Sequence, residues 1–522
     1  MSKQDVDSSN KSISLADEAK IVPDIPVHTL DYEAAPSSNP YYFPQLSWSD
    51  KEESKIIRTL DTRLFPWILL TTFVLNMDRT NHSNAVSDNL AVDLGFTNDT
   101  VNLGIAVYSV IFSFACLSGA VISKIVGPAR WIPVLMFAWG LVTMAHALIT
   151  DRSGYLTVRC MIALTEGGVI PATLVYLGSF YKSTELATRL AWFWGIQTIA
   201  SAVSGLMASG LLQLRGIGGL EGWKWLFLID GIITVVVAVA TWFYLPKNIA
   251  QTAGGLRGWK PWFDERQLQI GVTRVVQDDI SKRVYEQKVK WSDVKDAATD
   301  LGLWGHLLIT VIGMTPTTPL ATYLPTVIKS FHFDVFVANA LTAPPYVLQC
   351  IMMVSFIWHS DRFRERGLHG AFGAAWQLVG WILLRALPSG TSRGVKYFAA
   401  IVVAAWPYTH PLNIAWMSEN TGSVGKRTIA SGCVIFAANI YGVWGSQIYQ
   451  SDDAPDYKRG NTINICFAGV ALILWFVQKY YYRYRNARNA TLYAELSEQE
   501  KAEENDRAEE RGNRGLTYRF TT

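Results

Sequence analysis

Two pairs of oppositely charged residues stand inside long apolar stretches of the sequence. Asp78 and Arg79 follow the apolar run Leu64–Leu75, and Arg159 and Glu166 lie within a second apolar segment. Seven residues make nearly two turns of an α-helix, so Arg159 and Glu166 share one helix face, about 10 Å apart along its axis. This spacing predicts that both side chains point toward the same side of their helix.

These residue types suit the binding of an anion together with a proton. A guanidinium group binds a carboxylate through two parallel hydrogen bonds. A partly buried carboxyl group can carry a proton, because burial disfavours its charged form while a neighbouring arginine favours it. If both apolar segments face one cavity, the four groups would couple anion binding to proton uptake or loss. The alternative is a set of ion pairs that only holds helices together.

The composition is that of a membrane protein. Charged residues make up 17% of the 522 residues, against about 25% in average soluble domains. Hydrophobic residues reach 50%, and the chain has 20 Trp, a residue that favours the two membrane interfaces. The net charge of +3 is too small to indicate nucleic-acid binding.

Long apolar segments recur along the chain. A membrane-spanning helix needs roughly 20 mostly apolar residues. About twelve segments meet this length, which we expect near residues 62–85, 101–123, 131–149, 154–178, 189–213, 223–245, 302–328, 335–358, 369–387, 395–417, 428–450 and 461–482. The sequence therefore predicts an all-α membrane protein, a bundle of 12 transmembrane helices in two pseudo-symmetric six-helix halves.

The polar segments between and beside these spans divide the chain into regions. We expect a disordered cytosolic N-terminal tail, an N-terminal six-helix bundle, a cytosolic central loop, a C-terminal six-helix bundle and a charged cytosolic C-terminal tail, over residues 1–58, 59–245, 246–300, 301–484 and 485–522 respectively. Lysine and arginine are concentrated in alternate short loops, which places both termini in the cytosol.

Two of the short loops carry related basic motifs. The loop between the eighth and ninth spans reads HSDRFRERG, with Asp361, Arg362 and Arg366. The loop between the second and third spans keeps Gly127 and Arg130, and has Lys124 near where an acid is expected. Together with the six plus six spans, these loops resemble the gating-loop motifs of the major facilitator superfamily.

Within that superfamily the chain is similar to the anion:cation symporter family, and most to its fungal allantoate permease branch. The Asp-Arg-x-Asn pattern of that family matches Asp78, Arg79 and Asn81, and its fourth-helix arginine and glutamate match Arg159 and Glu166. Segments such as VGPARWIP and NIAWMSENTGSVGKR also resemble this branch. The resemblance implies that the two arginines bind a small carboxylate, such as allantoate, nicotinate or pantothenate. It also implies that Asp78 and Glu166 carry protons.

Other polar residues in the spans are further candidates for substrate contact. We expect such contacts from Asn81 and from a set of residues on other spans, namely Tyr108, Gln197, Tyr346, Asn413 and Asn439. Helix packing and interhelical hydrogen bonding are an equally good interpretation of these side chains. Asp230, early in the sixth span, is interpreted as an interfacial residue.

The sequence thus predicts a secondary active transporter, a proton-coupled symporter of a small organic anion in the plasma membrane. The alternatives are an exporter of an anionic metabolite and a transporter-like nutrient sensor. An enzyme is not expected, because the sequence has no Ser/His/Asp set, metal-ligand cluster, Walker-type loop or cofactor fingerprint. The expected partners are the anion, protons and the lipid bilayer, without cofactor, metal or nucleic acid. A monomer is expected.

Overall fold

The computed structural model describes residues 40–278, 291–388, 390–422, 424–507 and 511–522. The regular elements of these residues are helices, and no strand occurs among them. Nine helical segments of the described chain are long and apolar enough to cross a membrane.

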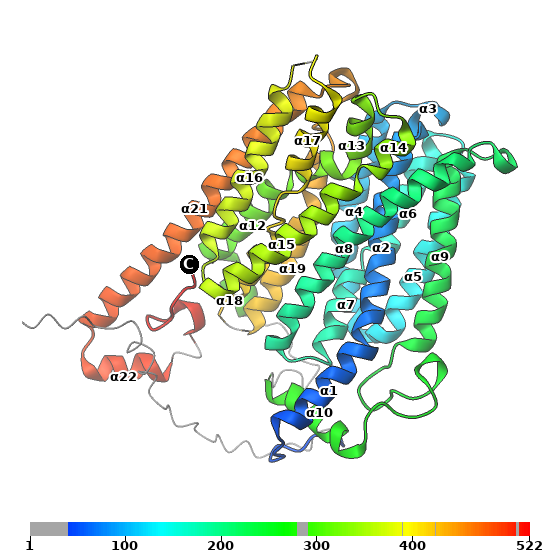
Figure 1. Ribbon diagram of the computed structural model, residues 1–522. Coiled ribbons are helices and arrows are strands. Elements are labelled where there is room, and N and C mark those ends of the chain that lie inside the picture. The colour runs from blue at the N-terminus through cyan, green and yellow to red at the C-terminus, as the bar shows by residue number, and fades with distance from the viewer. Residues whose placement is uncertain (1–39, 279–290, 389, 423, 508–510) are drawn as a thin grey trace, which may run out of the picture. The chain divides into compact units, whose positions relative to one another are not determined.

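The first six predicted spans form one group of helices (Figure 1). Helix pairs α5 with α9, α2 with α8 and α4 with α6 pack against each other within this group. In chain order the helices are α2 (Phe65–Ser87), α3 (Leu90–Asp93), α4 (Asn98–Val126), α5 (Pro128–Ala145), η2 (His146–Leu148), α6 (Arg152–Glu166), α7 (Val169–Gly178), α8 (Ser183–Leu211) and α9 (Gly222–Tyr244). We call this group the N-terminal half.

The last six predicted spans form a second group, in which several spans are divided into two helices. In chain order they are α12 (Leu301–Met314), α13 (Thr317–Ser330), α14 (Val335–Ala340), α15 (Ala343–Phe363), α16 (Gly367–Ala386), α17 (Arg393–Ala404), α18 (His410–Asn420), α19 (Val424–Ile440), α20 (Gly442–Gly445) and α21 (Lys458–Glu495). We call this group the C-terminal half.

Three predicted spans are not among the nine apolar segments, and each has a local reason. The polar residues from Asn76 to Ser87 lower the hydropathy of α2. The apolar part of α19 with α20, Ile429–Gly445, is shorter than the nine, and α17 and α18 are separated by the five residues 405–409. The deviations therefore fall where a span carries polar residues, is short or has a long break.

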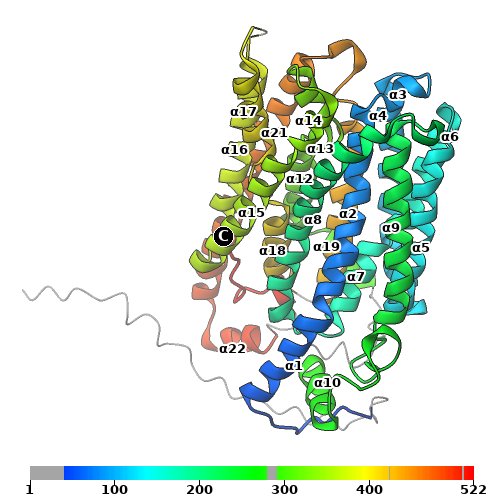
Figure 2. The same cartoon turned by 45° about the vertical axis from the view of Figure 1, so that its right-hand side comes forward.

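Helices also occur in the segments expected to be tail and loop. Figures 1 and 2 show α1 (Asp50–Arg63) beside α10 (Glu265–Asp278) at one end of the bundle. Ser49 and Glu52 form a capping box at the start of α1, and Ile56 and Leu60 are fully buried. In place of the disorder expected up to residue 58, the structure thus has a packed helix from Asp50 onward. Residues 1–39 of that predicted tail lie outside the described residues.

The central polar segment is anchored to the N-terminal half. Arg274 of α10 is fully buried and donates hydrogen bonds to Glu185 at 2.6 Å and to the carbonyl oxygen of Phe180 at 2.9 Å. A second helix, α11 (Trp291–Ala298), precedes the C-terminal half. A buried, paired arginine fixes α10 against the bundle, so this part of the loop is structured.

The C-terminal segment packs back onto the C-terminal half. The Phe520 ring stacks on Tyr482 with 5.0 Å between ring centroids. Trp416 Nε1 donates a hydrogen bond to the carbonyl oxygen of Thr521 at 2.7 Å. The predicted solvated tail therefore contains a docked segment at residues 511–522, which follows the charged helix α22 (Glu498–Asp506).

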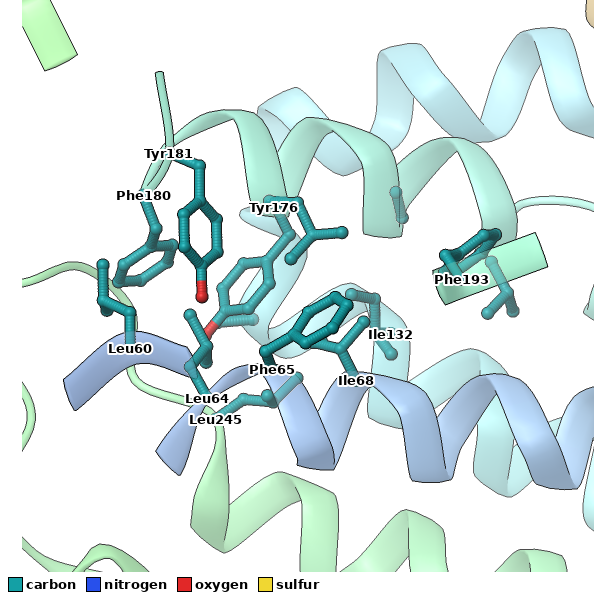
Figure 3. Packing of buried hydrophobic residues seen from close by; sticks show 14 of the residues in the cluster. Leu60, Leu64, Phe65, Ile68, Ile132, Tyr176, Phe180, Tyr181, Phe193 and Leu245 are labelled. Carbon is teal, nitrogen blue, oxygen red and sulfur yellow. The ribbon is translucent and has the colours of Figure 1, made fainter. Parts of the chain in front are cut away.

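A cluster of buried hydrophobic residues joins the start of α2 to α1 and α7. Figure 3 shows that these side chains face one another across the helices, with Leu60, Leu64, Phe65, Ile68, Ile132, Tyr176, Phe180, Tyr181, Phe193 and Leu245 labelled. The hydroxyl of Tyr176 donates to the carbonyl oxygen of Pro246 at 2.7 Å. This core fixes the first turns of α2, at Phe65 and Ile68. The polar part of α2, from Asn76 onward, therefore has a defined orientation.

Candidate functional site

A cavity of about 350 Å³ lies between the two halves. This volume is within the range of about 300–1,000 Å³ that small-molecule pockets occupy. Residues of α2, α4, α6 and α8 form one wall, and residues of α12, α13, α15 and α19 contribute to the other. A ligand in this cavity would therefore contact both halves.

The two walls differ in charge. The N-terminal half contributes all the arginines and carboxyl groups of the described lining, namely Asp78, Arg79, Arg159 and Glu166. The lining residues from the C-terminal half are uncharged, and several are aromatic: Tyr346, Trp406, Tyr408 and Tyr441. The cavity thus has a charged wall and an aromatic wall.

Glu166 is the centre of the charged wall. Its side chain is 1% exposed. Arg79 Nε donates to Glu166 Oε1 at 2.6 Å, and the Tyr108 hydroxyl donates to Glu166 Oε2 at 2.6 Å. The guanidinium group of Arg159 lies over the Tyr108 ring, 4.6 Å from its centroid. Glu166 therefore contacts Arg79 directly and is linked to Arg159 through Tyr108.

Three donors on this wall make no hydrogen bond to any described residue. They are Arg79 Nη2, Arg159 Nε and Gln197 Nε2, and all three are buried. Buried polar groups are nearly always hydrogen-bonded, so each exception needs a specific reason. A bound carboxylate has the acceptors that the two guanidinium groups require.

Asp78 has a different set of neighbours. The Thr143 hydroxyl donates to Asp78 Oδ2 at 2.7 Å, and the Asp78 side chain is 6% exposed. The carboxyl group of Asp230, on α9, faces that of Asp78. Asp230 is fully buried, so its interpretation as an interfacial residue is wrong.

A helical pattern in the sixth span would have located Asp230. Trp223, Phe227, Asp230 and Thr234 follow one another at spacings of four, three and four residues, and all are buried. Such spacing places them on one face of a helix. Because the face begins with a tryptophan and a phenylalanine, it predicts a position inside the bundle for Asp230.

Four spans of the described chain are interrupted beside the cavity. The breaks lie at residues 167–168 between α6 and α7, at 315–316 between α12 and α13, at 405–409 between α17 and α18, and at 441 between α19 and α20. The break at 405–409 carries Trp406 and Tyr408 to the aromatic wall, and the break at 441 carries Tyr441. Irregular backbone at membrane depth is tolerated where it lines a cavity, and broken helices often form transporter sites.

Glycine contacts bring α4 close to the first of these breaks. A Cβ atom on Gly119 would lie 2.4 Å from the Cα atom of Gly168, so α4 and the α6–α7 break touch through their backbones. This approach holds Glu166, the last residue of α6, close to Tyr108 on α4. Any larger residue at Gly119 would push these helices apart.

The structure brings most of the predicted substrate contacts to the cavity. Those that line it are Tyr108, Gln197, Tyr346 and Asn439. Asn81 and Asn413 are not among the lining residues. Asn81 Oδ1 accepts a hydrogen bond from Ser204 at 2.8 Å, and Asn413 Nδ2 donates to Thr310 at 2.9 Å. In this structure the two asparagines link neighbouring helices.

The basic motif of the C-terminal half lies outside the cavity lining. Arg366 forms ion pairs with Asp361 and with Glu419, and the distance from Arg366 Nη2 to Glu419 Oε1 is 2.6 Å. Arg362 is exposed. This loop therefore ties α15 and α16 to α18 within one half.

The corresponding loop of the N-terminal half joins α4 to α5. Gly127 has a φ of 91°, which favours glycine, and so allows the sharp turn between the helices. Arg130 is exposed. The side chain of Lys124 lies outside the described residues.

Hydrogen bonds between the halves gather at the end of the bundle that holds α3 and α14. Asn102 Nδ2 donates to the carbonyl oxygen of Tyr449 at 2.6 Å, and the Tyr323 hydroxyl donates to Asn102 Oδ1 at 2.6 Å. Lys329 Nζ donates to the carbonyl oxygen of Ser87 at 2.9 Å. These contacts join the two halves at that end of the cavity.

Comparison with known proteins places this architecture in a family. A family model described as the Major Facilitator Superfamily matches residues 68–446. An uncharacterized transporter of Saccharomyces cerevisiae is 31% identical over 480 residues, which cover 91% of this chain and 89% of that protein. The MFS-type transporter cnsO of Penicillium expansum is 31% identical over 421 residues, which cover 79% of this chain and 80% of that protein.

A solved structure shares the fold. The xylose transporter XylE of E. coli, in a partially occluded inward open conformation, aligns with a TM-score of 0.61 at 13% identity. The alignment covers 81% of this chain and 97% of that chain. The predicted all-α fold of two six-helix halves is therefore confirmed, and so is the prediction of a membrane transporter rather than an enzyme. Because the family model matches residues 68–446 and the yeast transporter is 31% identical, the chain belongs to the Major Facilitator Superfamily of multi-pass membrane transporters.

Proposed function

We propose that this transporter couples the movement of a small organic anion to protons by alternating access. The observation that carries the proposal is the charged wall, where the partly buried Arg79 and the buried Arg159 each keep one buried nitrogen donor without a partner among the described residues. Arginine is the side chain best suited to bind a carboxylate through two hydrogen bonds. The substrate carboxylate would lie between Arg79 and Arg159.

Glu166 gives a physical reason for proton coupling. It is the present partner of Arg79, at 2.6 Å. A substrate carboxylate that binds Arg79 competes with Glu166 for the same guanidinium group. A buried carboxylate that loses its cation is strongly destabilised, so Glu166 takes up a proton as the anion binds. Anion and proton then cross together, and each is released when the site opens on the other side.

Asp78 would be the second proton-carrying residue of the site. It lines the cavity beside Arg79 and is nearly buried, with the Thr143 hydroxyl as a hydrogen-bond donor. The positive charge of Arg159 stabilises the ionised form of Asp78. Neutralisation of Arg159 by the bound substrate would therefore also favour a proton on Asp78.

The aromatic wall would hold the rest of the substrate. Tyr346, Trp406, Tyr408 and Tyr441 offer ring faces and hydroxyl groups but no charge. A monocarboxylate with a small planar or apolar body matches both walls, because the anion faces arginine and the body faces aromatic rings. Nicotinate has this chemistry and is a suitable first compound to test.

The orientation belongs to the same proposal. The exposed Arg130 lies in the first turn of α5, beside the α4–α5 junction, and the exposed Arg362 lies in the last turn of α15, beside the α15–α16 junction. The excess of basic residues in such loops favours the cytosolic side, so the end with α1 and α10 would be cytosolic, and both termini with it. The protein would act as a monomer in the plasma membrane, with the bundles 59–245 and 301–484 moving as two bodies around the cavity.

Uptake into proteoliposomes tests this function. The full chain is reconstituted, and labelled carboxylic acids, beginning with nicotinate, are supplied under an imposed pH gradient. We expect accumulation that a protonophore abolishes, and no accumulation of nicotinamide, the uncharged counterpart. Uptake that ignores the protonophore, or that treats the acid and the amide alike, would contradict the proposal.

A further inference from the structure

Asp230 is a buried carboxyl group that the site described above leaves without a role. Its side chain is 0% exposed, and neither carboxyl oxygen accepts a hydrogen bond from a described donor. It lies on α9 and faces the Asp78 carboxyl and the Asn81 amide of α2. A buried polar group without a donor is unusual and calls for a physical explanation.

The chemistry of two facing carboxyl groups supplies that explanation. If Asp230 were ionised, the Asn81 amide would be the facing donor among the described residues, and one amide does not offset the loss of solvation of a fully buried charge. A neutral Asp230 instead has an O–H group, and the Asp78 carboxylate that it faces is an acceptor. Asp78 Oδ2 already accepts a hydrogen bond from Thr143 at 2.7 Å. The O–H group of a neutral Asp230 would give the Asp78 carboxylate a second hydrogen bond. The pair is then held together by one proton shared between two carboxyl groups.

The charged and titratable groups around Asp78 and Asp230 determine whether the pair binds one proton or two. On α6, Glu166 and Arg159 interact electrostatically with Asp78, and Glu166 also with Asp230. His146, at the end of α5, stacks on Phe227. Helix α8 faces α2 here with the neutral residues Ser201 and Ser204. Helix α13, which also packs against α2, lines the cavity with uncharged residues. His82, one turn after Asp78, completes the titratable groups on α2.

Arg159 is the cation of this set that the substrate would contact. While Arg159 is free, its positive charge favours an ionised Asp78 and hence a single proton on the pair. When a substrate carboxylate binds Arg159, it neutralises the charge of this guanidinium group. The negative charge on the Asp78–Asp230 pair then loses its compensating cation. A second proton then binds Asp78 from the side on which the substrate entered. It leaves on the other side, together with the substrate.

We propose that Asp78 and Asp230 form a carboxyl pair that carries one of the transported protons, with Asp230 as a proton-carrying residue of the site. The inference rests on the proposed function, in which Glu166 carries another proton. A monoanion that crosses with two protons transfers one positive charge. Transport should therefore respond to the membrane potential as well as to the pH gradient.

Asp230→Asn is the decisive variant because it keeps the size of the side chain and removes its proton. The amide group introduced by this substitution would donate to Asp78 and hold it ionised, which leaves Glu166 as the remaining proton carrier. In proteoliposomes with nicotinate as the probe, uptake driven by a pH gradient should remain. The stimulation by an inside-negative potassium diffusion potential, present in the wild type, should be lost. An unchanged response to the potential would overturn the proposal.

A second measurement reads the pair without transport. Infrared spectra of the full chain in liposomes, titrated with pH, should show the carbonyl band of a protonated carboxylic acid at neutral pH. This band should be absent from Asp230→Asn and retained in Asp230→Glu. If the band persists in Asp230→Asn, the proton is not on this pair and the inference fails.

Asp88→Asn is the matched control. Asp88 is also a nearly buried aspartate at the end of α2, but it pairs with Arg215 and does not line the cavity. Its amide variant should keep both the infrared band and the response to the potential. If the wild type shows no proton-driven uptake, the proposed function fails while the infrared measurement still decides the carboxyl pair.

Discussion

Arg159 combines two properties at the scale of a single residue, its charge and its planar shape. Its guanidinium group lies 4.6 Å from the centroid of Tyr108, and its Nε is buried without a partner. A lysine at this position keeps the charge but neither stacks on the ring nor offers a fork of donors. The geometry of the wall therefore predicts that Arg159→Lys is not a conservative change.

Arg159→Lys should raise the KM for the transported acid by about 10-fold or more, because a hydrogen bond to a charged group contributes about 1.5–3 kcal/mol. Initial rates of uptake over a range of substrate concentrations measure this change. Arg58→Lys, at an exposed position on α1, is the control and should leave KM as it is. Equal KM values for Arg159→Lys and the wild type would argue against a carboxylate fork at this residue.

How far single residues could be predicted depends on what determined their position. Arg159 and Glu166 share a helix face by spacing alone, and the structure brings both to the cavity. Asn81 and Asn413 have the same amide chemistry as Asn439, yet only Asn439 lines the cavity. A polar residue on an inner face can turn to the ligand or to a neighbouring helix, and one sequence does not distinguish these cases.

At the scale of elements, Asp300 connects three parts of the C-terminal half. It caps α12 by accepting a hydrogen bond from the Gly302 amide at 2.8 Å. Lys426 Nζ lies 2.5 Å from Asp300 Oδ2, and Asn513 Nδ2 donates to the same oxygen at 2.9 Å. Burial acts to raise the pKa of Asp300, but the hydrogen bonds and the charge of Lys426 outweigh it and lower this pKa.

The sign of this shift sets a pH dependence. Because the folded pKa lies below the unfolded value of about 3.9, ionised Asp300 stabilises the fold above that value. This stabilisation is lost as the pH falls through the folded pKa. Asp300→Asn should cost about 1–3 kcal/mol at pH 7, since Lys426 keeps a buried charge. The difference in melting temperature from the wild type should shrink as the pH falls below about 4.

Limited proteolysis adds an element-specific measurement. The amide oxygen introduced by Asp300→Asn is a weaker, uncharged acceptor for Asn513, so residues 511–522 should be held less firmly and cleaved faster than in the wild type. Asp506→Asn, at an exposed position on α22, should change neither proteolysis nor melting temperature. Equal melting temperatures for Asp300→Asn and the wild type at pH 7 would refute the connecting role of Asp300.

The elements themselves were largely predictable, and the exceptions have physical causes. Apolar length located the spans to within a few residues, as for 101–123 against α4 at Asn98–Val126. The docked segment 511–522 escaped prediction because its contacts are specific. A ring stack of Phe520 on Tyr482 and single hydrogen bonds hold it, and its mainly polar sequence contains no apolar periodicity.

At the scale of the whole molecule, the sequence could predict two halves but not which end of the cavity they close. A transporter of this type uses the same helices in each state, and only a few contacts between the halves differ. Asn102 and Tyr449 are 347 residues apart in the chain, and their hydrogen bond belongs to the end with α3. Such a contact has no signature in helix length or hydropathy.

Asn102 is therefore the residue to test for control of the access state. It is fully buried and bonds to both Tyr449 and Tyr323 across the interface. Asn102→Ala leaves a carbonyl and a hydroxyl group without their partner, at a cost of about 1–3 kcal/mol in the closed arrangement. Because 1.4 kcal/mol is about a tenfold change in an equilibrium, the population in which this end is open should rise by about 5- to 150-fold.

Spin labels on the two halves can measure this population. We choose exposed positions near the ends of α3 and α17, Val92→Cys and Ser392→Cys, in a chain whose five native cysteines are replaced by serine. Asn102→Ala should shift the interspin distances to longer values.

Asn461→Ala is the matched control, because this buried asparagine accepts from the Tyr449 hydroxyl within one half. It should destabilise the fold without changing the distances. If both variants kept the wild-type distances, the contacts of Asn102 would not control the opening of this end. If both lengthened them equally, general loosening rather than a gate between the halves would be the cause.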